Sequence, residues 1–204
     1  MKCSVCGASV RRTIDHMCVD CYLGSNRPSQ VQDRPWLFSS SFKWRKFNGE
    51  SRNSDLASAI FSDQIRIDKE KKRFILTVDS EELFVPFNVD AVDELAVKSG
   101  IRVGKWLVYR VRSEIDVVWE IIARATIDGD LGTSAKVSTN RQGNDRHVIC
   151  VYTADYLDLD DVNRVREKLD ALGFTERLCY KPDIYTYLGI YYRSTPLSAC
   201  RYRR

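Results

Sequence analysis

The sequence lacks any run of about 18 apolar residues, the length that a membrane-spanning helix requires. It also lacks an apolar segment behind Met1, because Lys2 and Cys3 follow directly, so we expect no secretory signal peptide. Internal repeats are missing, and a net charge of +4 is too small to identify a partner by itself. We therefore expect a cytoplasmic protein that makes no contact with a membrane.

Cysteine, by contrast, is concentrated at the N-terminus. Cys3 and Cys6 form one Cys-x-x-Cys motif, and Cys18 and Cys21 form a second one after 11 intervening residues. Two such motifs can hold four thiolates around one Zn²⁺ in tetrahedral geometry. We predict a zinc ribbon over residues 1–24 with Zn²⁺ as its cofactor. A disulfide framework is the alternative, which the missing signal peptide disfavours.

The loop of this ribbon carries Arg11, Arg12 and His16. The two arginines can contact phosphates or only solvate the loop, and four better placed thiolates argue against His16 as a metal ligand. A ribbon of this size can bind RNA, dock a protein partner or stabilise the N-terminus. The sequence leaves these three roles open.

A second domain is expected after the ribbon. Residues 25–34 are polar with Gly and Pro and without periodicity, which predicts a linker. Residues 35–204 then contain enough apolar material for one packed domain, since 44% of the chain is hydrophobic. Cys150, Cys179 and Cys200 are scattered, so we expect three ordinary thiols. The chain ends in a basic tail of Arg201, Arg203 and Arg204.

Runs rich in β-branched and aromatic residues predict the strands. Two of them, at 73–79 and 105–110, are bounded by charged residues or Gly. Two more, at 136–140 and 146–153, flank a turn signal and predict a hairpin. A last aromatic run at 185–191 predicts the final strand.

Helical periodicity appears twice between these strands. The first helix is expected to be capped by Ser113, and its apolar residues are Ile115, Val118, Trp119, Ile122 and Ala123. The second is expected to begin near Asp158 and to end before Gly173. Strands with helices returning between them predict an α+β fold, in which a curved, mostly antiparallel sheet is backed by helices.

Several of these segments carry a family resemblance. They are Gly104-Lys-Trp-Leu-Val-Tyr, Asp116-Val-Val-Trp119, Ala135-Lys-Val-Ser-Thr, Val148-Ile-Cys-Val-Tyr, Val165-Arg-Glu-Lys-Leu and Lys181-Pro-Asp-Ile-Tyr-Thr-Tyr-Leu-Gly-Ile-Tyr. Over about residues 100–193 the chain resembles the family of the basophilic leukaemia expressed protein (Bles), whose function is uncharacterised. The resemblance implies a fold similar to that of the cap-binding translation initiation factor 4E. The predicted zinc ribbon lies outside it.

Cap recognition requires two tryptophans around a charged purine, an acidic residue and cations for the phosphates. The resemblance places Arg141 and Arg146 at the phosphate-binding positions. No Trp occurs between Asp90 and Gly104, where the second stacking residue belongs. We therefore expect phosphate binding without recognition of a methylated cap.

The same segments are similar to the phosphothreonine lyases, which eliminate phosphate from a side chain. That similarity assigns Lys136 as the base and Lys105 and Arg146 as further site residues. The elimination also needs an acid to protonate the leaving oxygen. The family's acid position falls on Leu107, which has no proton to donate, and its last arginine falls near Tyr191.

His147 is the alternative acid, because it is the single histidine outside the ribbon. If Arg141 lies opposite Arg146, Lys136 and His147 share a sheet face but are separated by roughly 13 Å. A register slip of one residue would place them on opposite faces. Lys136 itself is either a base or an exposed edge lysine.

Three classes of function follow from these residues. The first is a binder of a phosphorylated ligand, RNA or a nucleotide, with the zinc ribbon and the basic tail adding contacts. Its phosphate-binding residues are Lys105, Lys136, Arg141 and Arg146. The second is a lyase-like enzyme with Lys136 as base and His147 as acid. The third is an adaptor that docks a protein partner through the ribbon.

Overall fold

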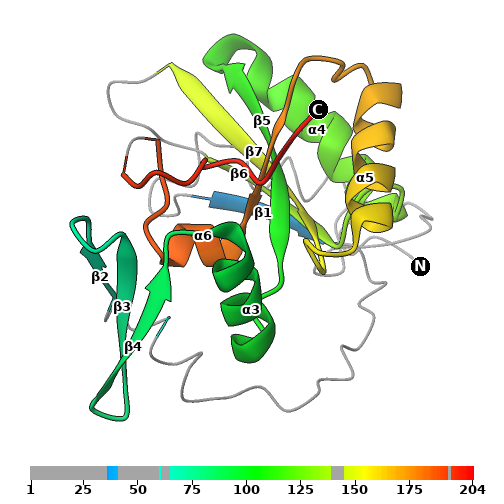
Figure 1. Ribbon diagram of the computed structural model, residues 1–204. Helices are drawn as coiled ribbons and strands as arrows, with labels where there is room; N and C mark the ends of the chain where they lie inside the picture. The colour runs from blue at the N-terminus through cyan, green and yellow to red at the C-terminus, as the bar shows by residue number, and fades with distance from the viewer. Residues whose placement is uncertain (1–35, 41–59, 61–64, 139–144, 193) are drawn as a thin grey trace.

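The computed structural model describes residues 36–40, 60, 65–138, 145–192 and 194–204, and the four cysteines of the predicted zinc ribbon and the linker lie outside them. The strands of the larger sheet are β1 (Trp36–Ser40), β5 (Gly104–Val111), β6 (Ser134–Ser138), β7 (Arg146–Thr153), β8 (Cys179–Pro182) and β9 (Tyr202–Arg203). Their order is β1-β6-β7-β5-β8-β9, and each pairing is antiparallel. A smaller antiparallel sheet contains β2 (Ile65–Asp68), β3 (Arg73–Val78) and β4 (Glu81–Pro86) (Figure 1).

Four described helices accompany the sheets: α3 (Val89–Ser99), α4 (Arg112–Asp128), α5 (Leu159–Ala171) and α6 (Asp183–Tyr187). Helices α4 and α5 cover one face of the larger sheet, and α3 and α6 lie beside the smaller one (Figure 1). The predicted α+β class, with an antiparallel sheet backed by helices, is therefore confirmed. None of the described helices is long and apolar enough to cross a membrane.

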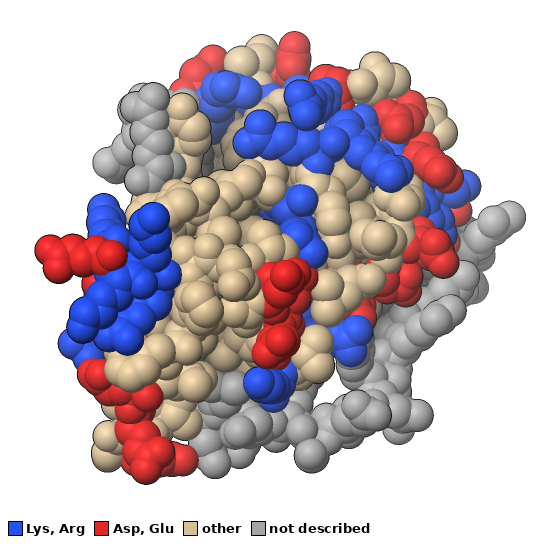
Figure 2. All heavy atoms as spheres, viewed as in Figure 1, with Lys and Arg blue, Asp and Glu red and all other residues tan. Residues whose placement is uncertain are grey.

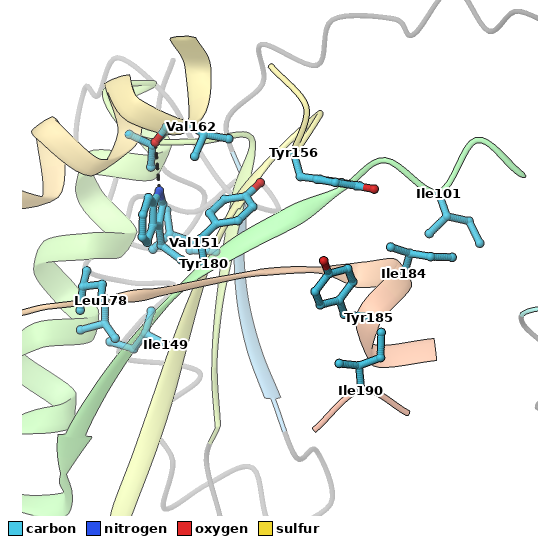
Figure 3. Packing of buried hydrophobic residues seen from close by; sticks show 14 of the residues in the cluster. Ile101, Ile149, Val151, Tyr156, Val162, Leu178, Tyr180, Ile184, Tyr185 and Ile190 are labelled. Atoms are coloured by element: carbon cyan, nitrogen blue, oxygen red, sulfur yellow. Dashed lines mark hydrogen bonds between the residues drawn. The ribbon is translucent and has the colours of Figure 1, made fainter. Parts of the chain in front are cut away.

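The core lies between the larger sheet and its two covering helices. Trp106 of β5 is fully buried, and its Nε1 donates a hydrogen bond to the Val162 carbonyl of α5 at 3.0 Å. Ile149, Val151 and Tyr180 extend from the strands toward the same layer (Figure 3). Each fully buried side chain of this size contributes about 1.5–3 kcal/mol of hydrophobic stabilisation, so this layer fixes which sheet face the helices cover.

The helix predictions are confirmed at α5 and partly wrong at α4. The Asp158 side chain accepts a hydrogen bond from the Asp161 N–H, and Gly173 follows the C-cap with a φ of 93°. Helix α4 instead begins at Arg112, directly after β5, with Val111 at the N-cap and no side-chain cap. Ser113 therefore lies inside the first turn, because the strand continues into the helix without a loop.

The strand predicted at 185–191 is wrong, since its first residues belong to α6. Pro182 precedes this helix with extended backbone, and Ile184 and Leu188 are buried one turn apart. Gly189, with a φ of 68°, ends it. Aromatic composition suggested a strand, but the buried residues follow helical spacing.

Several elements before residue 100 were not predicted, because their sequence patterns are short or weak. Strands β2 and β4 and helix α3 were not predicted. Helix α3 has clear caps, because Asn88 Oδ1 accepts from the Ala91 N–H at 2.7 Å and Gly100 adopts a φ of 71°. Strand β6 is described over Ser134–Ser138, and residues 139 and 140 of the predicted strand lie outside the described residues.

The prediction of three free thiols is wrong for two of them. Cys179 of β8 and Cys200 form a disulfide, and their Cα atoms are 5.4 Å apart. Cys150 is buried and is not part of a disulfide. The bridge fastens the C-terminal segment to the sheet, and β9 pairs with β8 beside it.

Candidate functional site

The register of the larger sheet places three lysines on one face. Lys105 of β5 is paired with Tyr152 of β7 on one side and with Lys181 of β8 on the other. Lys136 of β6 is paired with Cys150, two residues from Tyr152 on the same strand. Paired residues of antiparallel strands share a face, and neighbours along a strand alternate. Trp106, next to Lys105, points to the helices, so the lysines occupy the opposite face.

We call this side the lysine face and the three lysines the lysine cluster. The strand residues that the register assigns to this face are Lys105, Leu107, Tyr109, Val111, Ser134, Lys136, Ser138, Arg146, Val148, Cys150, Tyr152, Cys179, Lys181 and Arg203. Five of them are cationic and none is acidic. The described strands therefore present one sign of charge on this face, which favours an anionic ligand.

Tyr152 lies between two members of the lysine cluster. The Nζ atoms of Lys105 and Lys136 are each 5.5 Å from the centre of its ring. This is within the range in which a cation is attracted to an aromatic face. Burial raises the pKa of the Tyr152 phenol above its ordinary value, so the hydroxyl stays protonated. Both cations thus lie against one ring that adds no negative charge.

Helix α6 supplies the counter-ion of the cluster. Lys105 forms an ion pair with Asp183, the first residue of α6, and its Nζ lies 3.5 Å from Thr186 Oγ1. Only 9% of the Lys105 surface is exposed. A buried ammonium requires such a partner, because its transfer out of water is otherwise strongly unfavourable.

Lys181 is the member of the cluster that the sequence did not indicate. It is 6% exposed, and its Nζ lies 3.7 Å from the centre of the Tyr191 ring. Burial and the neighbouring charge of Lys105 lower the pKa of Lys181 to about 8, with Asp183 acting in the opposite direction. The alternation of an apolar Tyr180 with Lys181 could have indicated that Lys181 lies on the face opposite to the core. This inference requires that strand β8 be predicted first.

Arg146 extends the basic surface along β7. Its guanidinium carbon lies 5.5 Å from the centre of the Tyr109 ring, and both side chains are exposed. The structure therefore brings three of the four predicted phosphate-binding residues, Lys105, Lys136 and Arg146, to one face. The fourth, Arg141, lies outside the described residues.

The placement of His147 on the face of Lys136 is wrong. Lys136 is opposite Cys150, whereas the assumed pairing of Arg141 with Arg146 would have placed it opposite Val151. The register differs by one residue, and His147 accordingly lies on the helix-covered face. It is 6% exposed, and its Nδ1 is 2.9 Å from the Ser138 carbonyl oxygen. His147 thus cannot protonate a group that Lys136 contacts.

Comparison with known proteins identifies the family. The sequence profile of basophilic leukemia-expressed protein Bles03 matches residues 62–189, more than half of the chain. The chain belongs to the Bles03 family. The match begins near β2, earlier than the resemblance at residue 100 suggested, and it includes the whole lysine cluster of this Bles03 protein. The predicted zinc ribbon lies outside it.

Solved structures similar to this Bles03 chain include proteins of the eIF4E family, whose fold the resemblance implied. Schistosome eIF4E complexed with m7GpppA and 4E-BP is 13% identical with a TM-score of 0.39, and the match covers 50% of this chain and 59% of that one. Ascaris suum eIF4E-3 with an m7G cap is 14% identical with a TM-score of 0.38, over 82% and 93% of the two chains. C. elegans eIF4E-3 with the 4E-binding protein Mextli is 20% identical with a TM-score of 0.37, over 56% and 64%. With TM-scores below 0.5, these structures do not indicate which ligand this chain binds.

Proposed function

We propose that this Bles03 protein is a cytoplasmic binding protein for single-stranded RNA or a nucleotide, and that it uses the lysine face without catalysing a reaction. The zinc ribbon predicted at Cys3, Cys6, Cys18 and Cys21 and the basic tail would add contacts. The main observation that supports the proposal is that cations and tyrosine rings alternate on that face. Phosphates are held by cations, and bases stack on aromatic rings with little dependence on sequence.

Three cation and tyrosine groups support this reading. Arg146 lies against Tyr109, Lys105 and Lys136 lie against Tyr152, and Lys181 lies against Tyr191. Tyr109 and Tyr191 are 41% and 52% exposed, so each ring presents surface on which a base can stack. Tyr152 is half-buried and serves to position its two lysines.

The lyase-like alternative is supported by one observation, that Lys105, Leu107 and Lys136 occupy the same face in the order the similarity implied. Neither residue considered as its acid fits that role, because Leu107 has no ionisable group and His147 lies on the other face. A base alone can begin an elimination but cannot stabilise the departing phosphate oxygen. The binding function therefore fits the arrangement better.

The test is the salt dependence of RNA binding. We expect the affinity of the full-length protein for a single-stranded RNA, measured by fluorescence anisotropy, to fall steeply between 50 and 200 mM salt, as phosphate contacts require. The double variant Lys136→Met with Arg146→Met should reduce the logarithmic slope by about 1.4, since each phosphate contact on a single strand contributes about 0.7.

A matched control uses a second basic area, over the smaller sheet (Figure 2). Lys69→Met with Lys72→Met removes the same charge from the exposed turn between β2 and β3. This variant should retain the wild-type slope. If the control lowers the slope and the lysine-face variant does not, RNA binds at the smaller sheet and the proposal is wrong.

A further inference from the structure

The lysine cluster differs from the rest of the lysine face in its depth. Lys105 and Lys181 are 9% and 6% exposed, whereas Arg146 is exposed. A phosphate inside a nucleic-acid backbone carries a sugar on both sides, which hinders its approach to recessed amines. A terminal phosphate carries one substituent and offers three unsubstituted oxygens.

The charges of the cluster also favour a doubly charged group. Lys105 and Lys181 are direct cross-strand partners and share one carboxylate, Asp183. Lys136 lies against the Tyr152 ring from β6, which flanks β7 on the side opposite to β5. A backbone phosphodiester carries one negative charge, whereas a phosphate monoester carries about 1.5 to 2 near pH 7. The monoester therefore compensates more of the positive charge that the fold holds together here.

We propose that the lysine cluster is a site for the terminal phosphate monoester of a nucleotide or an RNA end, and that Lys181 takes up a proton when this phosphate binds. The inference rests on the proposed function and names its ligand class. The groups that face Lys181 are Lys105 from β5, Asp183 from α6 and the ring of Tyr191 from the segment after α6.

The proton uptake follows from the surroundings of Lys181. Without ligand, its pKa of about 8 leaves much of the side chain neutral at pH 8.5. A bound dianion favours the ammonium form and raises that pKa. Because binding raises the pKa of Lys181, the affinity for the phosphate is highest below pH 8 and declines as the pH rises above 8. The ligand does not contribute, because the second pKa of a phosphate monoester is about 6.

The experiment compares the RNA dinucleotide ApA with its 5′-phosphorylated form, pApA, by isothermal titration calorimetry on the full-length protein. At pH 7.5 we expect pApA to bind about tenfold more tightly, because it adds charge-assisted hydrogen bonds. At pH 8.5, titrations in buffers of different ionisation enthalpy should reveal net proton uptake with pApA and none with ApA.

Two variants test the role of Lys181 separately from folding. Lys181→Arg keeps a positive charge at all these pH values, so it should retain the preference for pApA and lose the proton uptake. Lys181→Met should lose both, and Lys72→Met, an exposed lysine between β2 and β3, should lose neither. Circular dichroism establishes that each variant is folded.

Each contrary result has a distinct meaning. If ApA and pApA bind equally and Arg146→Met weakens both, the proposed function stands and the monoester site is overturned. If neither dinucleotide binds, both are overturned. A phosphothreonine peptide that binds in place of pApA would overturn the nucleotide class. Proton uptake that persists in Lys181→Arg would overturn the role of Lys181.

Discussion

Lys105 and Lys181 are direct partners across the antiparallel strands β5 and β8, and both are buried. Residues in such a pair have Cβ atoms about 4.5–5.5 Å apart, a distance at which like charges repel. The fold tolerates the pair because Asp183 lies beside Lys105 and because the pKa of Lys181 is lowered to about 8. The arrangement opposes folding and favours an anion, which is typical of a functional site rather than of a structural one.

The first prediction concerns the stability of this pair as a function of pH. The unfolded chain holds the Lys181 proton up to the ordinary pKa of 10.5, and the folded chain releases it near pH 8. Between these values the unfolded state binds more protons, so this group's contribution to the free energy of unfolding rises with pH. We expect Lys181→Met to be more stable than wild type at pH 7 in urea unfolding, and this advantage to shrink by pH 10.

Lys168 on α5 is exposed, and Lys168→Met serves as the control. Its free energy of unfolding should differ from that of wild type by the same amount at pH 7 and pH 10. An advantage of Lys181→Met that is the same at pH 7 and pH 10 would show that Lys181 does not titrate early in the folded protein.

The second prediction concerns the disulfide. Cys179 and Cys200 are separated by 21 residues, and closing a loop of this length stabilises a fold by about 3 kcal/mol. A phosphine reductant should therefore lower the free energy of urea unfolding by about this amount. Cys200→Ser should resemble the reduced wild type, and Cys150→Ala should keep the full response to reductant. If reductant leaves wild-type unfolding unchanged, the two thiols are not bonded in solution.

The third prediction concerns metal. Purified protein should contain one Zn²⁺ per chain, bound by the four N-terminal cysteines. Cys3→Ser or Cys18→Ser should release it while the larger sheet stays folded, because that sheet has its own core. Atomic absorption measures the metal, and circular dichroism measures the fold. Less than half an equivalent of zinc in wild-type protein would contradict the prediction.

The fourth prediction separates binding from catalysis. We expect no loss of the elements of phosphoric acid from phosphothreonine peptides, measured by mass spectrometry. The reason is that neither acid considered for the lyase reaction is in place, because Leu107 carries no dissociable proton and His147 lies on the face opposite to Lys136. Leu107→His restores the residue that the lyase similarity expects between Lys105 and Tyr109. Dehydrobutyrine formed by wild type and abolished by Lys136→Ala would show that the protein is an enzyme.

The fold was predictable where apolar residues alternate or recur strongly. Strands β5 and β7 and helix α5 carry such patterns, and their positions are confirmed. Helix α6 was not predictable from composition, because its five residues include two Tyr, one Ile and one Thr, which fit a strand equally well. Its helical state depends on Pro182 at its start and on burial of one side, which only the tertiary fold supplies.

The candidate site was predictable in part for a different reason. Lys105, Lys136 and Arg146 followed from a family resemblance, but their meeting on one face depends on the register of three strands. A shift of one residue decides whether Lys136 and His147 lie on the same face of the sheet. The alternation of Tyr180 and Lys181 is too short a signal to identify Lys181, because β8 has four residues and its pairing with β5 joins segments far apart in the sequence.

The most direct test of the central claim, that the lysine face holds a phosphorylated ligand, is a crystal structure of the protein with pApA. We expect the terminal phosphate within about 2.7–3.2 Å of the amines of the lysine cluster, and a base stacked on Tyr191 or Tyr109. A dinucleotide bound at the turn between β2 and β3, with the lysine face empty at saturating ligand, would contradict the claim.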